Sequence, residues 1–287
     1  MNEHDGYRGL RYEFRLRAPQ DPAVEAYVAD LLAAQRGPVD APDTFTIRAT
    51  GDPGAFAYEL VLGSERWASA PRPEGLVTPL VQQVNARAVD TWDAGPVCHA
   101  GAVEHDGMAV VFPADQESGK TTLVTALVQA GFGYLTDEAA AFDQTAQVVP
   151  FPKPLSIDPG SWPLFPHLQP HADLPTTQYR DQQWQVAPDD IRAGAVGHRS
   201  SAAWIVFPNY ERGRPTVLQP IGRGEALMEL TRHTFGFAER SRVRLDELAA
   251  IVQGASCHRL TVGSLEEACR LITSLVGAPA VGLAASS

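Results

Sequence analysis

The stretch MAVVFPADQESGKTTLVTALVQAGF, residues 108–132, decides the fold of this chain. It opens with an apolar run, which is typical of a strand covered on both faces. From Lys120 to Ala130 the composition and the spacing of apolar residues predict a helix. Between the two lies a short loop that ends in Gly119. Because a phosphate-binding loop requires a strand, a loop and a helix in this order, we predict one here.

Such a loop binds phosphate because its backbone N–H groups converge on the anion and the following helix points its positive end at it. The pattern G-x-x-x-x-G-K-[ST] is met at Gly119, Lys120 and Thr121, but Ala114 stands at its first position. Ala is acceptable there if its backbone keeps a negative φ. The alternative is an ordinary helix N-terminus with a surface lysine. The predicted nucleotide-binding residues are Ala114, Asp115, Gln116, Glu117, Ser118, Gly119, Lys120, Thr121 and Thr122.

In this pattern the lysine reaches the β- and γ-phosphates and the hydroxyl of Thr121 binds Mg²⁺. A second group of candidate site residues follows the helix. A short strand is predicted over 134–136, and Asp137 and Glu138 stand at its end. Neighbouring residues of a strand point in opposite directions, so spacing alone does not say which carboxylate would meet a substrate and which a metal ion. A solvated acidic turn is the alternative interpretation.

A hairpin precedes the loop. Strands are predicted over 97–103 and 108–112, and the Asp-Gly pair at 106–107 favours a tight turn between them. His99 lies on the first of these strands, next to the loop strand. A satisfied core histidine is one interpretation of this residue.

The first part of the chain predicts a small α+β domain over 1–92. Its strands are expected around 12–16 and over 44–49 and 57–62, and its helices over 22–35 and 76–92. The second domain, 93–278, is predicted to be α/β, with a flexible tail over 279–287. Further strands are expected over 203–207 and 258–262, helices over 224–230, 245–252 and 265–276, and long surface loops over 148–190.

Composition excludes several classes of function. The formal net charge of −11 argues against a broad nucleic-acid surface, which needs clustered Lys and Arg. No apolar stretch approaches the roughly 20 residues that span a bilayer, so no membrane partner is expected. The N-terminus is polar, and the three cysteines have no metal-site spacing, which favours a reducing, cytoplasmic location. A homo-oligomer is left open.

Several segments together resemble the catalytic core of the HPr kinase/phosphorylase family, over roughly 96–275. The segments are His99-Ala100-Gly101-Ala102-Val103, Gly107, Ser118-Gly119-Lys120-Thr121, Gly131 and Asp137-Glu138, with weaker likeness at Pro152-Lys153-Pro154-Leu155-Ser156 and Val206-Phe207-Pro208-Asn209-Tyr210. The chain is also similar to HPr-kinase-like proteins that include kinases of lasso-peptide precursors. The resemblance implies a P-loop kinase core of the HPr-kinase/phosphoenolpyruvate-carboxykinase type that uses ATP and Mg²⁺. The chain departs from the family pattern at Ala114 and Glu138 and has no clear phosphorylase signature, so the phosphorolytic reverse reaction is not expected.

The resemblance also implies roles for single residues. Lys120 would neutralise the β/γ-phosphates, Asp137 would accept the proton of the substrate hydroxyl, and Glu138 would bind Mg²⁺ directly or through water. His99 would lie near the phosphates. From the sequence itself, Arg212 and Arg214 after the 203–207 strand could stabilise transition-state charge or be surface residues. Lys153, between two prolines, could contact phosphate or substrate.

These features predict an ATP- and Mg²⁺-dependent kinase. Its acceptor would be a Ser/Thr hydroxyl in a peptide or protein, with a role in peptide natural-product modification as one setting. A kinase of a small hydroxylated metabolite such as free serine is the second candidate. A nucleotide-binding partner or regulatory module without catalysis is the third.

Overall fold

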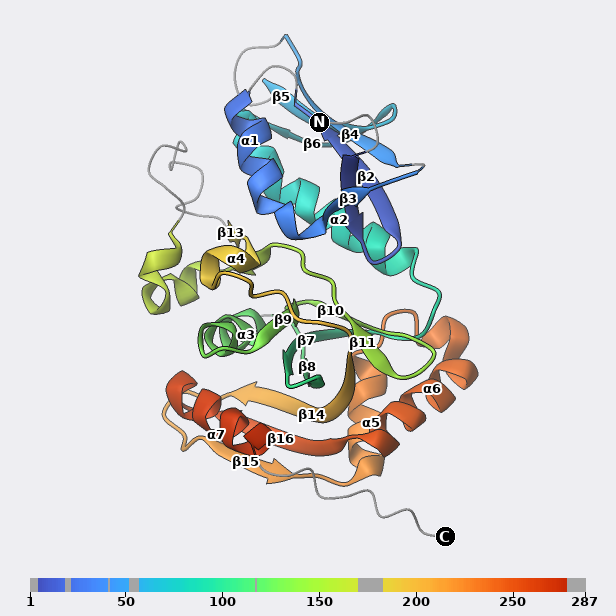
Figure 1. Ribbon diagram of the computed structural model, residues 1–287, viewed down its shortest axis with the longest axis vertical. Coiled ribbons are helices and arrows are strands. Elements are labelled where there is room, and N and C mark those ends of the chain that lie inside the picture. Colours follow the sequence, from blue (N-terminus) through green and yellow to red (C-terminus); the bar gives the residue numbers. More distant parts are fainter. Residues whose placement is uncertain are drawn as a thin grey trace.

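The computed structural model describes residues 5–18, 22–40, 42–51, 57–116, 118–169 and 183–277. The protein is a mixed α/β molecule with two large sheets, and Figure 1 shows the first sheet at one end and the second below it. Apolar cores lie under both sheets. None of the helices in the described ranges is long and apolar enough to cross a membrane.

The first sheet has six strands in the order β3-β1-β2-β4-β5-β6. Its strands are β1 (Asp5–Gly9), β2 (Tyr12–Arg17), β3 (Arg36–Pro38), β4 (Asp43–Ala49), β5 (Tyr58–Leu62) and β6 (Glu65–Ala70). The period-two pattern of β2 is confirmed, because Tyr12, Phe14 and Leu16 are buried and the residues between them are less so. Such alternation identifies a strand with one face on the core.

Two helices, α1 (Pro22–Leu31) and α2 (Val77–Asp90), pack against this sheet. The predicted helix over 22–35 is too long, because α1 ends at Leu31 and a 3-10 turn (Ala33–Gln35) follows it. The apolar stripe of α2 is buried, and its members are Val77, Leu80, Val81, Val84 and Ala88. Val97, Ala139 and Phe151 of the second sheet region belong to the same core, so α2 contacts both halves of the molecule.

The second sheet runs in the order β11-β10-β7-β8-β14-β16-β15, with β9 paired to β7. Its strands are β7 (Val97–His105), β8 (Met108–Pro113), β9 (Gly133–Thr136), β10 (Ala139–Phe142), β11 (Gln147–Val149), β14 (Ser200–Tyr210), β15 (Val217–Pro220) and β16 (Ser256–Val262). The predicted hairpin is present, since β7 and β8 are antiparallel and Asp106 and Gly107 both have positive φ. The strands β8, β14 and β16 are parallel. Their carboxyl ends therefore meet at one edge of the sheet.

Helices cover both faces of this sheet (Figure 1). On one side lie α3 (Lys120–Gln129) and α7 (Leu265–Gly277), and on the other α5 (Arg223–Arg232) and α6 (Ser241–Gly254). This double cover explains why β8 is apolar along its length.

The stretch 148–190, predicted as long surface loops, is more ordered than expected in its described part. It forms a small sheet of β12 (Leu155–Ile157) and β13 (Trp184–Val186), the short helix α4 (Pro188–Ile191), and two 3-10 helices, Pro159–Leu164 and Pro166–Leu168. Trp162 stacks on Trp184 with ring centroids 4.7 Å apart, which joins the first 3-10 helix to β13. β12 and α4 in turn contact α3. Apolar contacts of this kind give a stretch that is rich in proline and polar residues a defined structure.

Candidate functional site

The loop between β8 and α3, residues 114–119, opens the site. Gly119 precedes α3 with φ +83°, a left-handed conformation that favours glycine. Ala114 is buried and is not among the described residues with positive φ, so the backbone condition for alanine at this position is met. Glu117 lies outside the described residues.

Lys120 is folded back over this loop. Its Nζ donates to the carbonyl oxygen of Ala114 at 2.8 Å, to that of Asp115, and to Ser118 Oγ at 3.4 Å. Burial lowers the pKa of Lys120 to about 8, although Asp137, Glu138 and Asp115 oppose the shift. A cation held at the first turn of α3 in this way is a natural partner for phosphate.

Asp115, the acidic loop residue that the structure describes, lies beside His233. The Asp115 side chain is 92% exposed and lies 3.6 Å from Nδ1 of His233. Burial, the larger effect, lowers the pKa of His233 although Asp115 opposes it. The sequence had indicated no role for His233, whose contact with Asp115 joins the loop to the end of α5.

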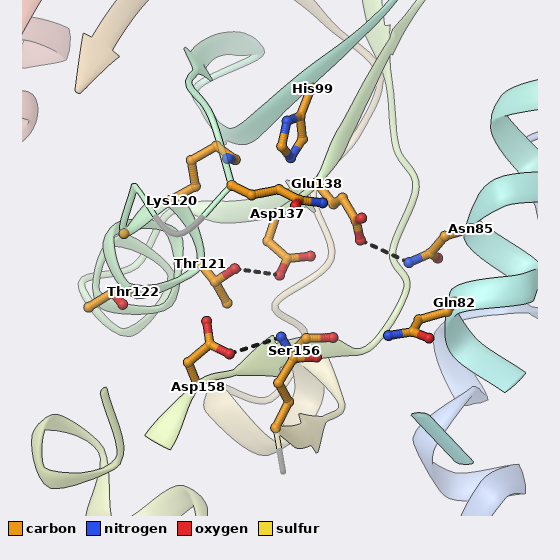
Figure 2. Close-up of a pocket in the computed structure, with 13 residues that line it drawn as sticks. Gln82, Asn85, His99, Lys120, Thr121, Thr122, Asp137, Glu138, Ser156 and Asp158 are labelled. Carbon is orange, nitrogen blue, oxygen red and sulfur yellow. Dashed lines mark hydrogen bonds between the residues drawn. The ribbon is translucent and has the colours of Figure 1, made fainter. Parts of the chain in front are cut away.

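Asp137 is the most strongly anchored group of the site. Thr121 Oγ1 donates to its Oδ2 at 3.0 Å, and Tyr134 OH donates to its Oδ1 at 2.9 Å. The ammonium of Lys153 lies 2.6 Å from the same Oδ1. Both oxygens of a buried carboxylate are thus engaged, so Asp137 holds Thr121 and the loop in place (Figure 2).

Glu138 has a different environment. Its side chain is 41% exposed, and its Oε2 accepts a hydrogen bond from Asn85 Nδ2 at 2.9 Å. Lys153 Nζ lies 3.5 Å from the same oxygen. Among the described residues Oε1 accepts no hydrogen bond, so one oxygen of Glu138 is free to meet a ligand.

Lys153 lies behind the two carboxylates and does not line the pocket. Burial alone would lower its pKa, but Asp137 and Glu138 outweigh burial and raise the pKa above its ordinary value. Its predicted contact with phosphate or substrate is replaced by this ion pair. Only two of the 23 Lys and Arg residues of the chain are lysines, and both, Lys120 and Lys153, lie at this site.

The other predicted basic side chains, His99, Arg212 and Arg214, are placed differently. His99 lines the pocket, and burial, reinforced by Lys120, lowers its pKa. Its backbone carbonyl accepts the Ala114 N–H, which joins β7 to the loop. Arg212 and Arg214 are exposed on the turn after β14, Arg214 pairs with Glu211, and neither arginine lines the pocket.

These groups surround a pocket of about 260 Å³ that Figure 2 shows in close-up. Its lining residues are Gln82, Asn85, His99, Gln116, Gly119, Lys120, Thr121, Thr122, Asp137, Glu138, Ser156, Asp158 and Gln183. Five of them were not expected from the sequence as site residues: Gln82, Asn85, Ser156, Asp158 and Gln183. Asp158 accepts a hydrogen bond from Gln183 Nε2 at 2.9 Å. This bond joins the start of the 3-10 helix Pro159–Leu164 to the start of β13 at the pocket.

One side of the pocket presents oxygen atoms that could coordinate a metal ion. The hydroxyl of Thr121 and the carboxylates of Asp137 and Glu138 fit Mg²⁺, which is usually held by one or two carboxylates and otherwise by phosphate and water. Within the described ranges no group of three His, Cys, Asp or Glu side chains could hold a metal ion by itself. The residues present therefore fit Mg²⁺ that is bound together with phosphate.

A second cavity, of about 550 Å³, lies on the other flank of the α3 N-terminus. It shares Gly119, Thr122 and Asp158 with the first pocket. The rest of its lining comes mainly from the carboxyl ends of β14 and β16 and from the 3-10 segment: Gly160, Ser161, Leu164, Pro208, Tyr210, Val262 and Leu265, with Ser118 and Leu123. Leu164 and Tyr210 are more than half exposed in this cavity, so it offers apolar side chains beside a polar loop.

Comparison with known proteins adds little to this geometry. No family model matches the chain, and no curated protein matches it. Among solved structures, the HPr(Ser) kinase/phosphatase from Coxiella burnetii is similar at 12% sequence identity and a TM-score of 0.31, over 63% of this chain and 93% of that chain. A similarity this weak carries no argument about function, which rests on the strands, the loop and the pocket described above.

Proposed function

We propose that the protein is an ATP- and Mg²⁺-dependent kinase that transfers the γ-phosphate to a hydroxyl group. One observation carries the proposal: Thr121, tied to the buried Asp137, stands beside Lys120 at the positive end of α3, and Glu138 shares their pocket. Phosphoryl transfer needs little more from a protein than positioning and charge stabilisation of this kind.

The triphosphate would lie on the loop, with the N–H groups at the start of α3 and Lys120 as its partners. The second cavity then receives the nucleoside, because it begins at Ser118 and Gly119 and is lined by apolar side chains. A site with such a cavity suits a nucleotide better than a simple polyphosphate. Mg²⁺, held by Thr121 and Asp137, would neutralise phosphate charge.

The geometry favours an exchange of the two acidic roles. Asp137 Oδ1 is engaged by Tyr134 and Lys153, and its Oδ2 accepts the Thr121 hydroxyl, so the accessible part of this carboxylate lies beside Thr121. Glu138 has a free Oε1 in a partly exposed side chain. We therefore assign the general base to Glu138, and to Asp137 the holding of the Thr121 hydroxyl and, with it, of Mg²⁺.

In the proposed step, the oxygen of the acceptor hydroxyl forms a bond to the γ-phosphorus. The bond between that phosphorus and the bridging β–γ oxygen breaks, and ADP leaves with the bond electrons. The hydroxyl proton moves to the Glu138 carboxylate. Lys120 and the helix N-terminus stabilise the charge on the phosphoryl oxygens.

Isothermal calorimetry with Mg-ATP tests the proposal, because binding depends on Lys120. Lys120→Ala should weaken the affinity about ten-fold or more, as the loss of a charge-assisted contact requires. Arg214→Ala, which removes an exposed cation outside the pocket, is the matched control and should leave the affinity unchanged. Equal affinity of wild type and Lys120→Ala would remove the phosphate-loop assignment. Binding without transfer to any acceptor would favour the regulatory module.

A further inference from the structure

The first pocket and the second cavity meet along three residues. Gly119, Thr122 and Asp158 line both of them. In ATP the ribose joins the α-phosphate to the base. With the triphosphate on the loop and the base in the second cavity, the ribose therefore lies where the two spaces meet. The chemistry of these three residues then decides which sugar the site accepts.

Two of the three residues present little to a sugar. Gly119 has no side chain. Thr122 Oγ1 lies 2.6 Å from Ser161 Oγ, so these two hydroxyls are hydrogen-bonded to each other and hold the 3-10 helix Pro159–Leu164 against the first turn of α3. Asp158 is the residue of this junction that carries a charged group.

The side chain of Asp158 is turned toward the cavities. Asp158 precedes the 3-10 helix Pro159–Leu164 as its N-cap residue, a position where an aspartate commonly accepts a backbone N–H, yet its side chain makes no capping hydrogen bond. Its Oδ1 instead accepts the bond from Gln183 Nε2 that Figure 2 shows. Among the described residues Oδ2 accepts no hydrogen bond, and Asp158 is exposed, so a ligand can reach this oxygen.

The chemistry of a carboxylate decides which part of a nucleotide Asp158 can meet. An ionised carboxylate is an acceptor only, and its charge repels phosphate. It fits a hydroxyl donor, and the ribose of a nucleotide has two, at its 2′ and 3′ positions. Carboxylates recognise ribose in this way in dinucleotide-binding folds, and a bond to a charged acceptor is stronger than one between neutral groups.

We propose that Asp158 Oδ2 accepts a hydrogen bond from the ribose hydroxyls of the bound nucleotide, so that the phosphoryl donor is a ribonucleotide. Asp158 is then a specificity-determining residue for the donor, and Gln183 holds its carboxylate in position. This assignment rests on the proposed kinase function, in which the nucleoside occupies the second cavity.

The test compares ATP with 2′,3′-dideoxy-ATP, which has the same phosphates and base but no ribose hydroxyl. In calorimetry with Mg²⁺, the wild type should bind ATP about ten-fold or more tightly than dideoxy-ATP, because a hydrogen bond to a charged group is lost. In Asp158→Ala this ratio should fall to near one, and the affinity for tripolyphosphate should stay unchanged or rise. Asp246→Ala removes an exposed carboxylate of α6 outside both cavities, and as the matched control it should keep the ratio.

The ratio separates sugar recognition from a general defect. If Asp158 served only the fold or Mg²⁺, its loss would weaken both nucleotides equally, and a ratio that stays at its wild-type value in Asp158→Ala overturns the proposal. Equal affinity of the wild type for ATP and dideoxy-ATP also overturns it.

Lys120→Ala keeps the two proposals apart. If this variant binds both nucleotides and tripolyphosphate more weakly, while the wild type binds ATP and dideoxy-ATP equally, the ribose assignment is wrong and the phosphate loop stands. If Lys120→Ala changes none of the three affinities, the proposed nucleotide site is itself wrong, and the ribose assignment fails with it.

Discussion

Lys153 Nζ lies 2.6 Å from Asp137 Oδ1, and both side chains are almost completely buried. Asp137 in turn accepts the hydroxyl of Thr121, the second residue of α3. The ammonium also lies 3.5 Å from Glu138 and donates to the carbonyl of Pro154. One buried lysine thus connects the segment before β12 to both carboxylates and, through Asp137 and Thr121, to the start of α3.

Removal of this ammonium should destabilise the fold. Lys153→Met leaves the Asp137 carboxylate buried without its cation, which typically costs about 3–5 kcal/mol. The double variant Lys153→Met/Asp137→Asn removes both charges and should recover part of that loss. Urea unfolding followed by circular dichroism measures the three free energies.

An exposed pair provides the control for this comparison. Arg214→Met breaks an ion pair with Glu211 whose arginine side chain is 70% exposed, and should cost at most about 1 kcal/mol. Equal losses for Lys153→Met and Arg214→Met would show that the buried pair does not support the site.

The exchange of acidic roles predicts different defects for two variants. Glu138→Gln should lower the rate of transfer by about 10²–10⁴ and leave Mg-ATP affinity unchanged or higher, because a general base is lost and a carboxylate near phosphate disappears. Asp137→Asn should act mainly through Mg-ATP affinity, since it loosens Thr121. Rates with saturating labelled ATP, beside calorimetric affinities, measure both. If Asp137→Asn, checked for folding, loses transfer at normal affinity and Glu138→Gln does not, Asp137 is the base.

The fold elements with strong local signals were predictable. The apolar run of β8, the glycine before Lys120 and the helical spacing of α3 are all local features, and they place the loop correctly in the chain. β10 was missed because Ala139–Phe142 is an alanine-rich strand whose position depends on pairing with β7 and β11. β12 and β13 have three residues each, too few for a period to be recognised.

Eight of the thirteen described lining residues of the pocket could be predicted for the same reason. Lys120 and Thr121 begin α3, and His99 lies on β7. Asp137 and Glu138 lie in the bend between β9 and β10, and the pocket brings all five side chains together. Asn85 could not be predicted, because α2 shows an apolar stripe but not which unit its polar side will meet. Which residues the polar side of α2 meets depends on how α2 packs between the two sheets. This packing joins segments that are distant in the sequence.

The lowered pKa of Lys120 predicts how nucleotide binding depends on pH. Below its pKa of about 8 the lysine is charged in the free protein, so its contribution to ATP affinity is fully present. Above pH 8 binding must take up a proton, and the dissociation constant should rise by up to about ten-fold per pH unit. Calorimetry from pH 7 to 9.5 measures the slope, and Lys120→Arg should abolish it because arginine stays protonated.

The same pKa can be measured directly because the chain has two lysines. In protein labelled with ¹³C-lysine, one of the two side-chain signals should titrate near pH 8 and vanish in Lys120→Ala, while Lys153 titrates higher. Two signals that both titrate above pH 10 would contradict the burial of Lys120 at the loop.

The second cavity predicts that the protein distinguishes ATP from inorganic tripolyphosphate, which has the phosphates but no nucleoside. Tyr210→Ala removes an exposed ring from the cavity wall and should lower ATP affinity, by up to about ten-fold if the base stacks on it, without an effect on tripolyphosphate.

Gly160→Trp should have the same selective effect by filling the space, since a Cβ at Gly160 meets no atom within 4 Å. Gly222→Trp, equally open but outside the cavity, is the control. Lys120→Ala should weaken both ligands. If the ratio of the two affinities is the same in wild type, Tyr210→Ala and Gly160→Trp, the nucleoside does not occupy this cavity, and the donor must be placed elsewhere around the loop.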